Sequence, residues 1–133
     1  MKSLKLLAAN KGVGHFQAKI SPSKTTLFLF DAIASDRETA EIFGGTAPED
    51  FSRAVAQSTG DIDIYVNSPG GCVFGGQAMA ASIKRASGRV RVFVDGLAAS
   101  AATVVAAAAD EVVMSAGSFF MIHNSWTGVI GNA

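Results

Sequence analysis

The stretch Val90-Arg-Val-Phe-Val-Asp-Gly-Leu-Ala-Ala-Ser100 decides the fold, because it leads from a strand through a turn into a helix. Apolar residues alternate over 90–94, which predicts a strand, and Gly96 predicts a turn after it. Ser100 then opens an apolar run, 101–109, that is typical of a buried helix. A hydroxyl at the first turn of a helix lies near unpaired N–H groups and the positive end of the helix dipole. Small neighbours leave it accessible, so Ser100 is a candidate nucleophile, with helix N-capping as the structural alternative.

The segments around this stretch alternate between strand and helix patterns. A capping box with proline in the first turn, Thr46-Ala-Pro-Glu49, predicts the start of a helix that ends near Gly60. Further helices are expected over 73–86 and 101–109, and strands over 16–20, 25–33, 61–67, 90–94, 111–114 and 119–123. This order predicts an α/β fold with right-handed crossovers and a mainly parallel sheet. Sites usually form in loops at the carboxyl ends of such strands, here 68–71, 95–100 and 123–126.

Size and composition indicate one globular domain, which we expect to span 1–133. The 133 residues are enough for one core, and 49% hydrophobic against 17% charged residues is a globular composition. Eleven basic residues balance eleven acidic ones, so no nucleic-acid or membrane partner is expected. A neutral, apolar-rich domain also tends to associate, which favours a homo-oligomer.

Other segments narrow the location and the class of protein. Cys72 is the only cysteine, which excludes an internal disulfide and a CxxC metal site and favours the cytoplasm. The apolar core at 6–9 is too short for a signal peptide, and residues 1–13 are expected to form a loose arm. The apolar run 97–109 is too short to span a bilayer.

Two further segments carry chemistry. In Ser68-Pro69-Gly70-Gly71, paired glycines can turn backbone N–H groups outwards to bind an oxyanion or a peptide; a tight strand-to-helix turn is the alternative. The Lys-Ser/Thr ending of a phosphate loop is absent. His123 closes an apolar strand, and imidazole is the usual general base for a serine hydroxyl, although a purely structural histidine is the alternative. His15, the other histidine, has no partner motif and is expected at the surface.

Together these motifs resemble the Clp protease proteolytic-subunit family. The matching segments are Asp-Ile-Tyr-Val-Asn-Ser-Pro-Gly-Gly (63–71), Gly-Leu-Ala-Ala-Ser (96–100) and Met-Ile-His-Asn (121–124). The resemblance covers roughly 61–126 and implies a ClpP/crotonase-like α/β fold of repeated β-β-α units with helices flanking a mainly parallel sheet. Asp31-Ala-Ile33 and Thr46-Ala-Pro-Glu-Asp-Phe51 are more similar to the Clp-like head-maturation proteases of tailed phages and prophages, which cleave scaffold and capsid protein inside the prohead.

The resemblance implies a serine endopeptidase that needs no metal and no cofactor. Ser100 would be the nucleophile and His123 the general base and acid, while backbone N–H groups of Gly71 (or Gly70) and Ala101 would form the oxyanion hole. It also implies a homo-oligomer, such as a ring, in the bacterial cytoplasm or the phage prohead, acting on a polypeptide such as capsid or scaffold protein. The residues expected to bind substrate are Gly71, Cys72, Val73 and Asn124.

One element of the family pattern has no counterpart. The family's third catalytic residue, an Asp beyond the histidine, is missing, since no acid follows Glu111. Asp31, Asp95 and Asp110 do not match its position; we expect Asp95 in a strand-end turn and Asp110 at the end of the Ser100 helix. We therefore interpret the chain as truncated at its C-terminus and expect weak or no activity, because loss of the acid costs about four orders of magnitude in rate. We also expect an exposed apolar face there.

Three alternative functions fit parts of the pattern. A crotonase-type acyl-CoA enzyme shares the fold and uses paired N–H groups, but lacks the serine followed by Met-Ile-His. A serine–lysine peptidase would need Lys84, which is poorly placed on the helix after the glycine pair. A non-catalytic structural or assembly module would use the same fold without the chemistry.

Overall fold

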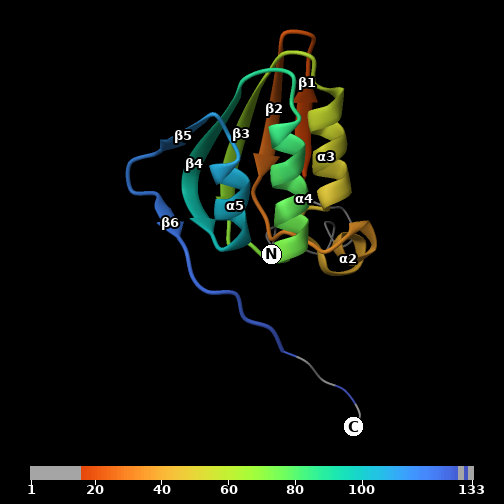
Figure 1. Ribbon diagram of the computed structural model, residues 1–133, viewed down its shortest axis with the longest axis vertical. Coiled ribbons are helices and arrows are strands. Elements are labelled where there is room, and N and C mark those ends of the chain that lie inside the picture. Colours follow the sequence, from red (N-terminus) through yellow and green to blue (C-terminus); the bar gives the residue numbers. More distant parts are fainter. Residues whose placement is uncertain (1–15, 129–130, 132–133) are drawn as a thin grey trace, which may run out of the picture.

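The computed structural model describes residues 16–128 and 131. Within this part, helices cover one face of a six-stranded sheet (Figure 1). The strands are β1 (Gln17–Ile20), β2 (Lys24–Leu29), β3 (Asp61–Ser68), β4 (Val90–Ala99), β5 (Glu111–Met114) and β6 (Phe119–Met121). The helices are α2 (Arg37–Phe43), α3 (Pro48–Gln57), α4 (Val73–Lys84) and α5 (Ala101–Ala107).

The sheet is mostly parallel, as the sequence predicts. Its order is β1-β2-β3-β4-β5, and only the β1–β2 pair is antiparallel. Strand β6 pairs in parallel with the second half of β4. The alternation of strand and helix along β2, β3, β4 and β5 therefore produces the expected α/β architecture, with α3, α4 and α5 packed in front of the sheet in Figure 1.

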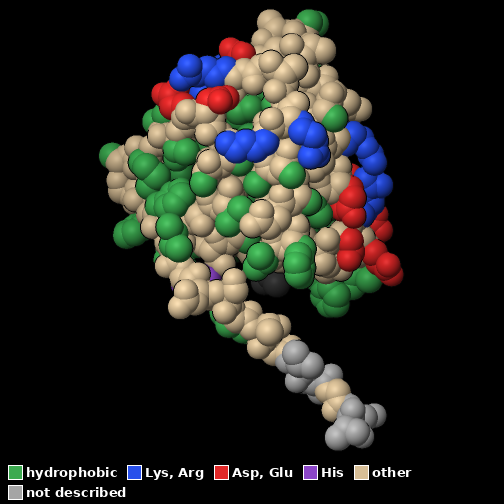
Figure 2. Space-filling view, viewed as in Figure 1, with side chains coloured by type: hydrophobic (Ala, Val, Ile, Leu, Met, Phe, Trp, Pro, Cys, Tyr) green, Lys and Arg blue, Asp and Glu red, His purple; other side chains and the backbone are tan. Residues whose placement is uncertain are grey.

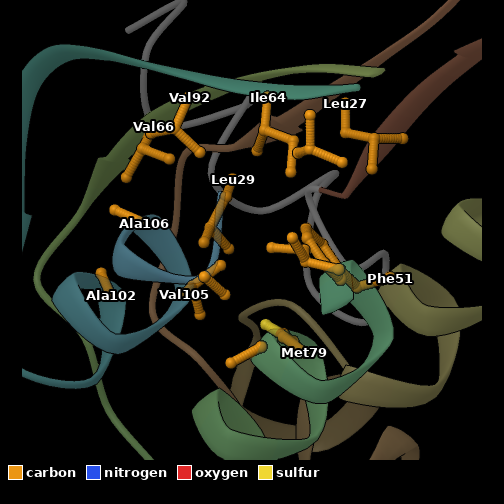
Figure 3. Close-up of a cluster of buried hydrophobic side chains, with 14 of the residues drawn as sticks. Leu27, Leu29, Phe51, Ile64, Val66, Met79, Val92, Ala102, Val105 and Ala106 are labelled. Carbon is orange, nitrogen blue, oxygen red and sulfur yellow. The ribbon is translucent and has the colours of Figure 1, made fainter. Parts of the chain in front are cut away.

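The core fills the space between the sheet and these helices (Figure 3). Leu27, Ile64 and Val92 lie side by side on neighbouring strands and are fully buried. Phe51 from α3 and Met79 from α4 are also fully buried and belong to the same cluster. Each such side chain contributes about 1.5–3 kcal/mol through burial, so this layer holds the sheet and the helices together. The predicted buried helix after Ser100 is confirmed as α5, although it ends at Ala107.

The opposite face of the sheet carries a row of aromatic rings. Tyr65 on β3 stacks on Phe28 of β2 and on Phe93 of β4, with ring centroids 5.5 Å and 5.0 Å apart. Beside this row, the buried carboxylate of Asp63 pairs with Lys24 at 2.6 Å and with Arg91 at 2.9 Å. Ring stacking and ion pairs therefore stabilise the face that α3, α4 and α5 leave uncovered.

The predicted turn at Gly96 is wrong, because β4 runs on without interruption to Ala99. Residues 91–94 pair with β5, and residues 97–99 pair with β6 while Ala98 also faces Ser68 of β3. Hydrogen bonds to strands on both sides thus hold the chain extended where the sequence alone indicates a turn. Asp95 consequently lies within a strand, and its carboxylate accepts a hydrogen bond from the Ser115 hydroxyl at 3.1 Å.

The predicted capping box at Thr46 is also wrong. Helix α3 begins at Pro48 with Ala47 as its N-cap, and no side chain caps it. Thr46 is still in extended backbone, because its N–H donates to the Ala32 carbonyl at 2.7 Å and its carbonyl accepts from Ala34 N–H at 3.0 Å. Its buried hydroxyl has no hydrogen-bond partner among the residues that the structure describes.

The segment 25–33 differs from its predicted strand. Strand β2 ends at Leu29, and a single bridge residue, Ile33, follows before α2, which the sequence did not predict. The caps of α2 are Asp36, whose side chain accepts from Thr39 N–H, and Gly44. The strand predicted over 119–123 ends at Met121. The expected arm over 1–13 and the surface position of His15 fall outside the described residues.

Exposed apolar side chains gather at β5, β6 and the segment after them (Figure 2). They are Val112, Val113, Met114, Phe119, Phe120, Met121, Ile122 and Trp126. An apolar surface at the C-terminal end therefore exists, as the sequence predicts. No helix in the described part of the chain is both long enough and apolar enough to cross a membrane.

Candidate active site

The loop after β3 is fastened by a buried serine. The Ser68 hydroxyl donates to the Asp31 carbonyl at 2.6 Å and accepts the Gly70 N–H at 3.2 Å. Ser68 itself is fully buried. The hydroxyl therefore ties the start of the glycine loop to the chain that leaves β2.

Both glycines of this loop adopt backbone angles that side-chain-bearing residues rarely take: φ is 87° at Gly70 and 145° at Gly71. The loop pairs with Ile33, whose N–H donates to the Gly70 carbonyl at 2.8 Å and whose carbonyl accepts the Cys72 N–H at 2.9 Å. In such a bridge the N–H and carbonyl of the middle residue point to the other side. The N–H of Gly71 thus faces away from Ile33, whereas that of Gly70 is already bonded to Ser68.

Ser100 occupies a strained position between β4 and α5. Its φ of 54° is the only positive value at a non-glycine residue within 16–128. Its N–H donates to the Met121 carbonyl at 2.9 Å, and its carbonyl accepts from both the N–H and the hydroxyl of Thr103. Such a conformation costs about 1–3 kcal/mol and persists only where its surroundings enforce it, often at active sites. The Ser100 side chain makes no capping hydrogen bond, so its hydroxyl does not serve as the N-cap that we considered as the alternative.

Ser100 and His123 line the same cavity. The cavity has a volume of about 460 Å³ and opens where β3, β4 and β6 end. Its lining residues are Pro69, Gly71, Cys72, Val73, Ser100, His123, Ser125 and Trp126. Three segments that are far apart in the sequence, each at the carboxyl end of a parallel strand, thus meet at one place, as the position of the loops predicts.

Comparison with known proteins identifies the family. Residues 53–133 match the model of the Clp protease family, which is more than half of the chain. This chain belongs to the Clp protease family. The ATP-dependent Clp protease proteolytic subunit of Bacteroides thetaiotaomicron is 34% identical over 121 residues, covering 82% of this chain and 54% of the relative. That of Bacteroides fragilis is 33% identical over 121 residues, covering 82% and 57%. This Clp protease chain therefore spans about half the length of these relatives.

Solved structures share its fold. ClpP1 from Listeria monocytogenes superimposes with a TM-score of 0.52 at 23% identity, covering 82% of this chain and 52% of that one. The ClpP catalytic domain from Plasmodium falciparum gives 0.52 at 24% identity, covering 93% and 60%. An enoyl-CoA hydratase described as putative, from Streptomyces coelicolor, gives 0.58 at 18% identity, covering 80% and 47%. The ClpP/crotonase-like fold is thereby confirmed.

Four further residues of this Clp protease chain were expected at the site: Gly70, Cys72, Ala101 and Asn124. Gly70 and the buried Ala101 lie directly beside Ser100: a Cβ at position 70 would approach the Ser100 Cβ and the Ala101 nitrogen to 2.9 Å. Cys72 is the N-cap of α4, and its sulfur accepts the Gly75 N–H at 3.5 Å. Asn124 does not line the cavity, which is instead lined by Ser125 and Trp126. Neither Ser125 nor Trp126 was named individually from the sequence, although both fall in the loop 123–126 that the sequence predicts to be part of the site.

Lys84 lies at the far end of α4 from the cavity. Twelve helical residues separate the helix ends by about 17 Å, and Val73 is the end that lines the cavity. The serine–lysine alternative is therefore not supported by the arrangement of α4.

The acids considered as triad members are bound elsewhere. Asp31 accepts the Ala32 N–H at 2.8 Å, and Asp110 accepts the Val90 N–H at 2.7 Å just after α5. The Asp95 carboxylate accepts a hydrogen bond from the Ser115 hydroxyl. No carboxylate forms an ion pair with His123 in the range 16–128.

Proposed function

We propose that this chain carries the catalytic serine and histidine of a Clp-type serine peptidase. The observation that carries the proposal is the strained Ser100 in the same cavity as His123 and Gly71. A nucleophile and an imidazole in one accessible cavity, beside an outward backbone N–H, are the parts that acyl transfer requires. Family membership and the relatives' name as proteolytic subunits support the same activity.

In the proposed reaction, His123 takes the hydroxyl proton as the Ser100 oxygen attacks the peptide carbonyl. The C–N bond then breaks, His123 returns the proton to the leaving amine, and an ester remains on Ser100. Water, deprotonated by His123, then attacks this ester; the acyl–oxygen bond breaks, His123 returns the proton to the Ser100 oxygen, and the second product leaves as a carboxylic acid. Histidine alone moves the protons, so the mechanism needs neither metal nor cofactor.

The alkoxide formed in each step is stabilised by two backbone N–H groups, those of Gly71 and Ala101. Gly71 is favoured over Gly70 because the Gly70 N–H is engaged by Ser68. Ala101 is the first residue of α5, where an N–H has no partner within the helix. Each such donor contributes about 10²- to 10³-fold to turnover.

The proposed substrate is an extended polypeptide. The strand-like backbone at Gly71, together with Cys72 and Val73, can pair with it as an added strand. Asn124, which the sequence also assigns to substrate binding, does not line this cavity, so the proposal gives it no contact with the substrate. The exposed Trp126 gives the cavity a large apolar wall for a substrate side chain.

Among natural substrates, we propose phage capsid or scaffold protein, processed in the bacterial cytoplasm or the prohead. This part rests on the sequence pattern at Asp31–Ile33 and Thr46–Phe51. Its test is digestion of purified phage capsid and scaffold proteins by this protein, with an unrelated unfolded polypeptide such as casein as the comparison. Equal cleavage of both would refute this part of the proposal.

We also propose that the protein works as a homo-oligomer. The exposed apolar side chains of β5 and β6 support this, because contiguous apolar patches mark association surfaces. The same surface favours a second candidate function, an assembly module without catalysis. Sedimentation measurements beside the labelling experiment below separate the two, since a pure assembly module associates without reacting.

A fluorophosphonate probe tests the catalytic proposal directly. We expect covalent labelling of Ser100, abolished by Ser100→Ala and strongly slowed by His123→Gln. Ser125→Ala is the matched control, because Ser125 is a second serine in the same cavity and takes no part in the proposed reaction; labelling should be retained in this variant. With no acid beside His123 among the described residues, labelling should be slow, by about four orders of magnitude relative to a complete triad. Labelling that survives Ser100→Ala, or no labelling at all, would refute the proposal.

A further inference from the structure

Strands β3 and β4 change register just before they reach the candidate site. Val66 of β3 faces Val94 of β4, yet two residues later Ser68 faces Ala98. β4 therefore uses four residues where β3 uses two, and the irregularity falls on 95–97. A bulge of this kind re-aims the end of a strand and must be held by local contacts.

The shift has two consequences for the site. In an unbroken register Ser68 would face Gly96, and Gly70 would lie near Ala98; with the shift, Gly70 lies against Ser100. The same shift marks the point where β4 exchanges one neighbour, β5, for another, β6. β6 leads to His123. The bulge thus sets where both the glycine loop and the histidine segment meet residue 100.

Asn67 holds the bulge through its side-chain oxygen. Its side-chain oxygen accepts the Leu97 N–H at 3.1 Å, in a solvent-exposed hydrogen bond that joins the two strands within the bulge. The same oxygen lies where a Cβ of residue 96 would be only 2.7 Å away. Gly96 does not have a positive φ, so the close approach and not the backbone angle is what a side chain there would disturb. Since the Asn67 oxygen is the end of a flexible side chain, a Cβ at position 96 would push it away from the Leu97 N–H.

We propose that Asn67 is a positioning residue for the nucleophile. It acts through its hydrogen bond to the Leu97 N–H, and the absence of a side chain at Gly96 leaves room for its side-chain oxygen. Its side chain fixes the two-residue shift and thereby places Ser100 against the glycine loop. The effect on catalysis rests on the proposed peptidase function, whereas the effect on the position of Ser100 does not.

A double-mutant cycle tests this, using Asn67→Ala, Gly96→Ala and both together. Two readouts are measured on each folded protein: amide hydrogen exchange at Leu97 and Ser100, and the rate of fluorophosphonate labelling of Ser100. We expect either single change to accelerate amide exchange at both residues and to slow labelling by about 3- to 10-fold, as for the loss of one solvent-exposed hydrogen bond. Gly96→Ala should add little to Asn67→Ala, since the clash requires the Asn67 side chain.

Two further variants sharpen the result. Asn67→Asp keeps an acceptor oxygen at the same place and should return both readouts to the values of the unmodified protein. Ser115→Ala is the matched control, because it removes a side-chain hydrogen bond to Asp95 in the same bulge without touching Asn67. This variant should leave amide exchange at Leu97 and Ser100, and the labelling rate of Ser100, unchanged.

The outcomes separate this proposal from the peptidase proposal. If the unmodified protein is labelled but Asn67→Ala is labelled equally fast, the positioning role is overturned and the peptidase stands. If the unmodified protein is not labelled, the peptidase proposal fails and exchange decides: joint acceleration at Leu97 and Ser100 supports Asn67, and acceleration at Leu97 alone overturns it. Additive effects of the two single changes also overturn it.

Discussion

Gly76 of α4 lies directly against Ala101, the residue that follows Ser100. A Cβ at position 76 would approach the Ala101 carbonyl oxygen to 3.0 Å and its Cβ to 3.1 Å. Both helices begin at the candidate site, so this close contact sets how near the start of α5 lies to α4. A side chain at 76 can be accommodated only if Ala101, and Ser100 with it, moves.

Gly76→Val should therefore separate the two helices and displace the nucleophile. Overpacking of this kind costs about 1–3 kcal/mol of folding stability, and we expect labelling of Ser100 to fall at least tenfold beyond what that loss explains. Denaturant unfolding and probe labelling measure the two effects. Gly128→Ala is the control, since nothing lies within 4 Å of its Cβ position; equal labelling of both variants would contradict the prediction.

Ser68→Ala should loosen the glycine loop. It removes the hydroxyl that joins the Asp31 carbonyl to the Gly70 N–H and leaves both without that partner in a buried place. We expect a loss of about 1–3 kcal/mol in the free energy of unfolding. Ser118→Ala, which removes an exposed hydroxyl bonded to Ser115, should cost less than about 0.5 kcal/mol. A similar cost for the two would show that the buried bond is unimportant.

Asp63→Ala should destabilise the sheet more than its place on the uncovered face implies. The Asp63 side chain is only 4% exposed and pairs with Lys24 and Arg91, which are 49% and 39% exposed. Because water reaches both cations, we expect a loss of about 1–3 kcal/mol in the free energy of unfolding, which is below the range for a fully buried pair. Asp50→Ala is the matched control: its pair with Arg37 is about 40% exposed on both sides and should contribute under about 1 kcal/mol. Thermal unfolding at one pH compares them.

The start of α2 should respond to acid. The backbone N–H of Thr39, then its hydroxyl and that of Ser35, lower the pKa of Asp36. The cap's contribution is therefore complete above the ordinary pKa of an aspartate, about 3.9, and is lost as the pH falls through the lower folded-state value. Amide exchange at Thr39 during an acid titration should show this loss. Asn at position 36 still caps but does not titrate, so Asp36→Asn should abolish the response; an unchanged acid response in that variant would assign it to another group.

Much of the sheet could be predicted because its signals are local. Ile62, Ile64 and Val66 alternate on β3 as Val90, Val92 and Val94 do on β4, and these residues are the buried ones. The second half of β4 could not be predicted, since Gly96 indicates a turn and only pairing with β6 keeps the chain extended. The capping box at Thr46 was predicted wrongly for the same reason, because the bridge between Thr46 and Ile33 overrides the local capping signal.

Some features of the candidate site could likewise be predicted from the sequence, and others could not. Ser100, His123 and the glycine pair could be named from the motifs, and all three segments reach one cavity. The choice of Gly71 over Gly70 could not be made, since it depends on where the Ser68 hydroxyl points. Nor could the positive φ of Ser100 be predicted, since one of the contacts at this residue is a hydrogen bond to Met121, which lies on a strand 21 residues later in the chain.

Trp126 is the only tryptophan in the chain, it lines the cavity, and it is 84% exposed. Its indole fluorescence therefore comes from a single, water-facing position beside Ser100 and His123. A peptide or inhibitor that fills the cavity displaces that water, so the emission should shift to shorter wavelength as binding proceeds. Occupancy of the site can thus be titrated without a label, even for ligands that never react.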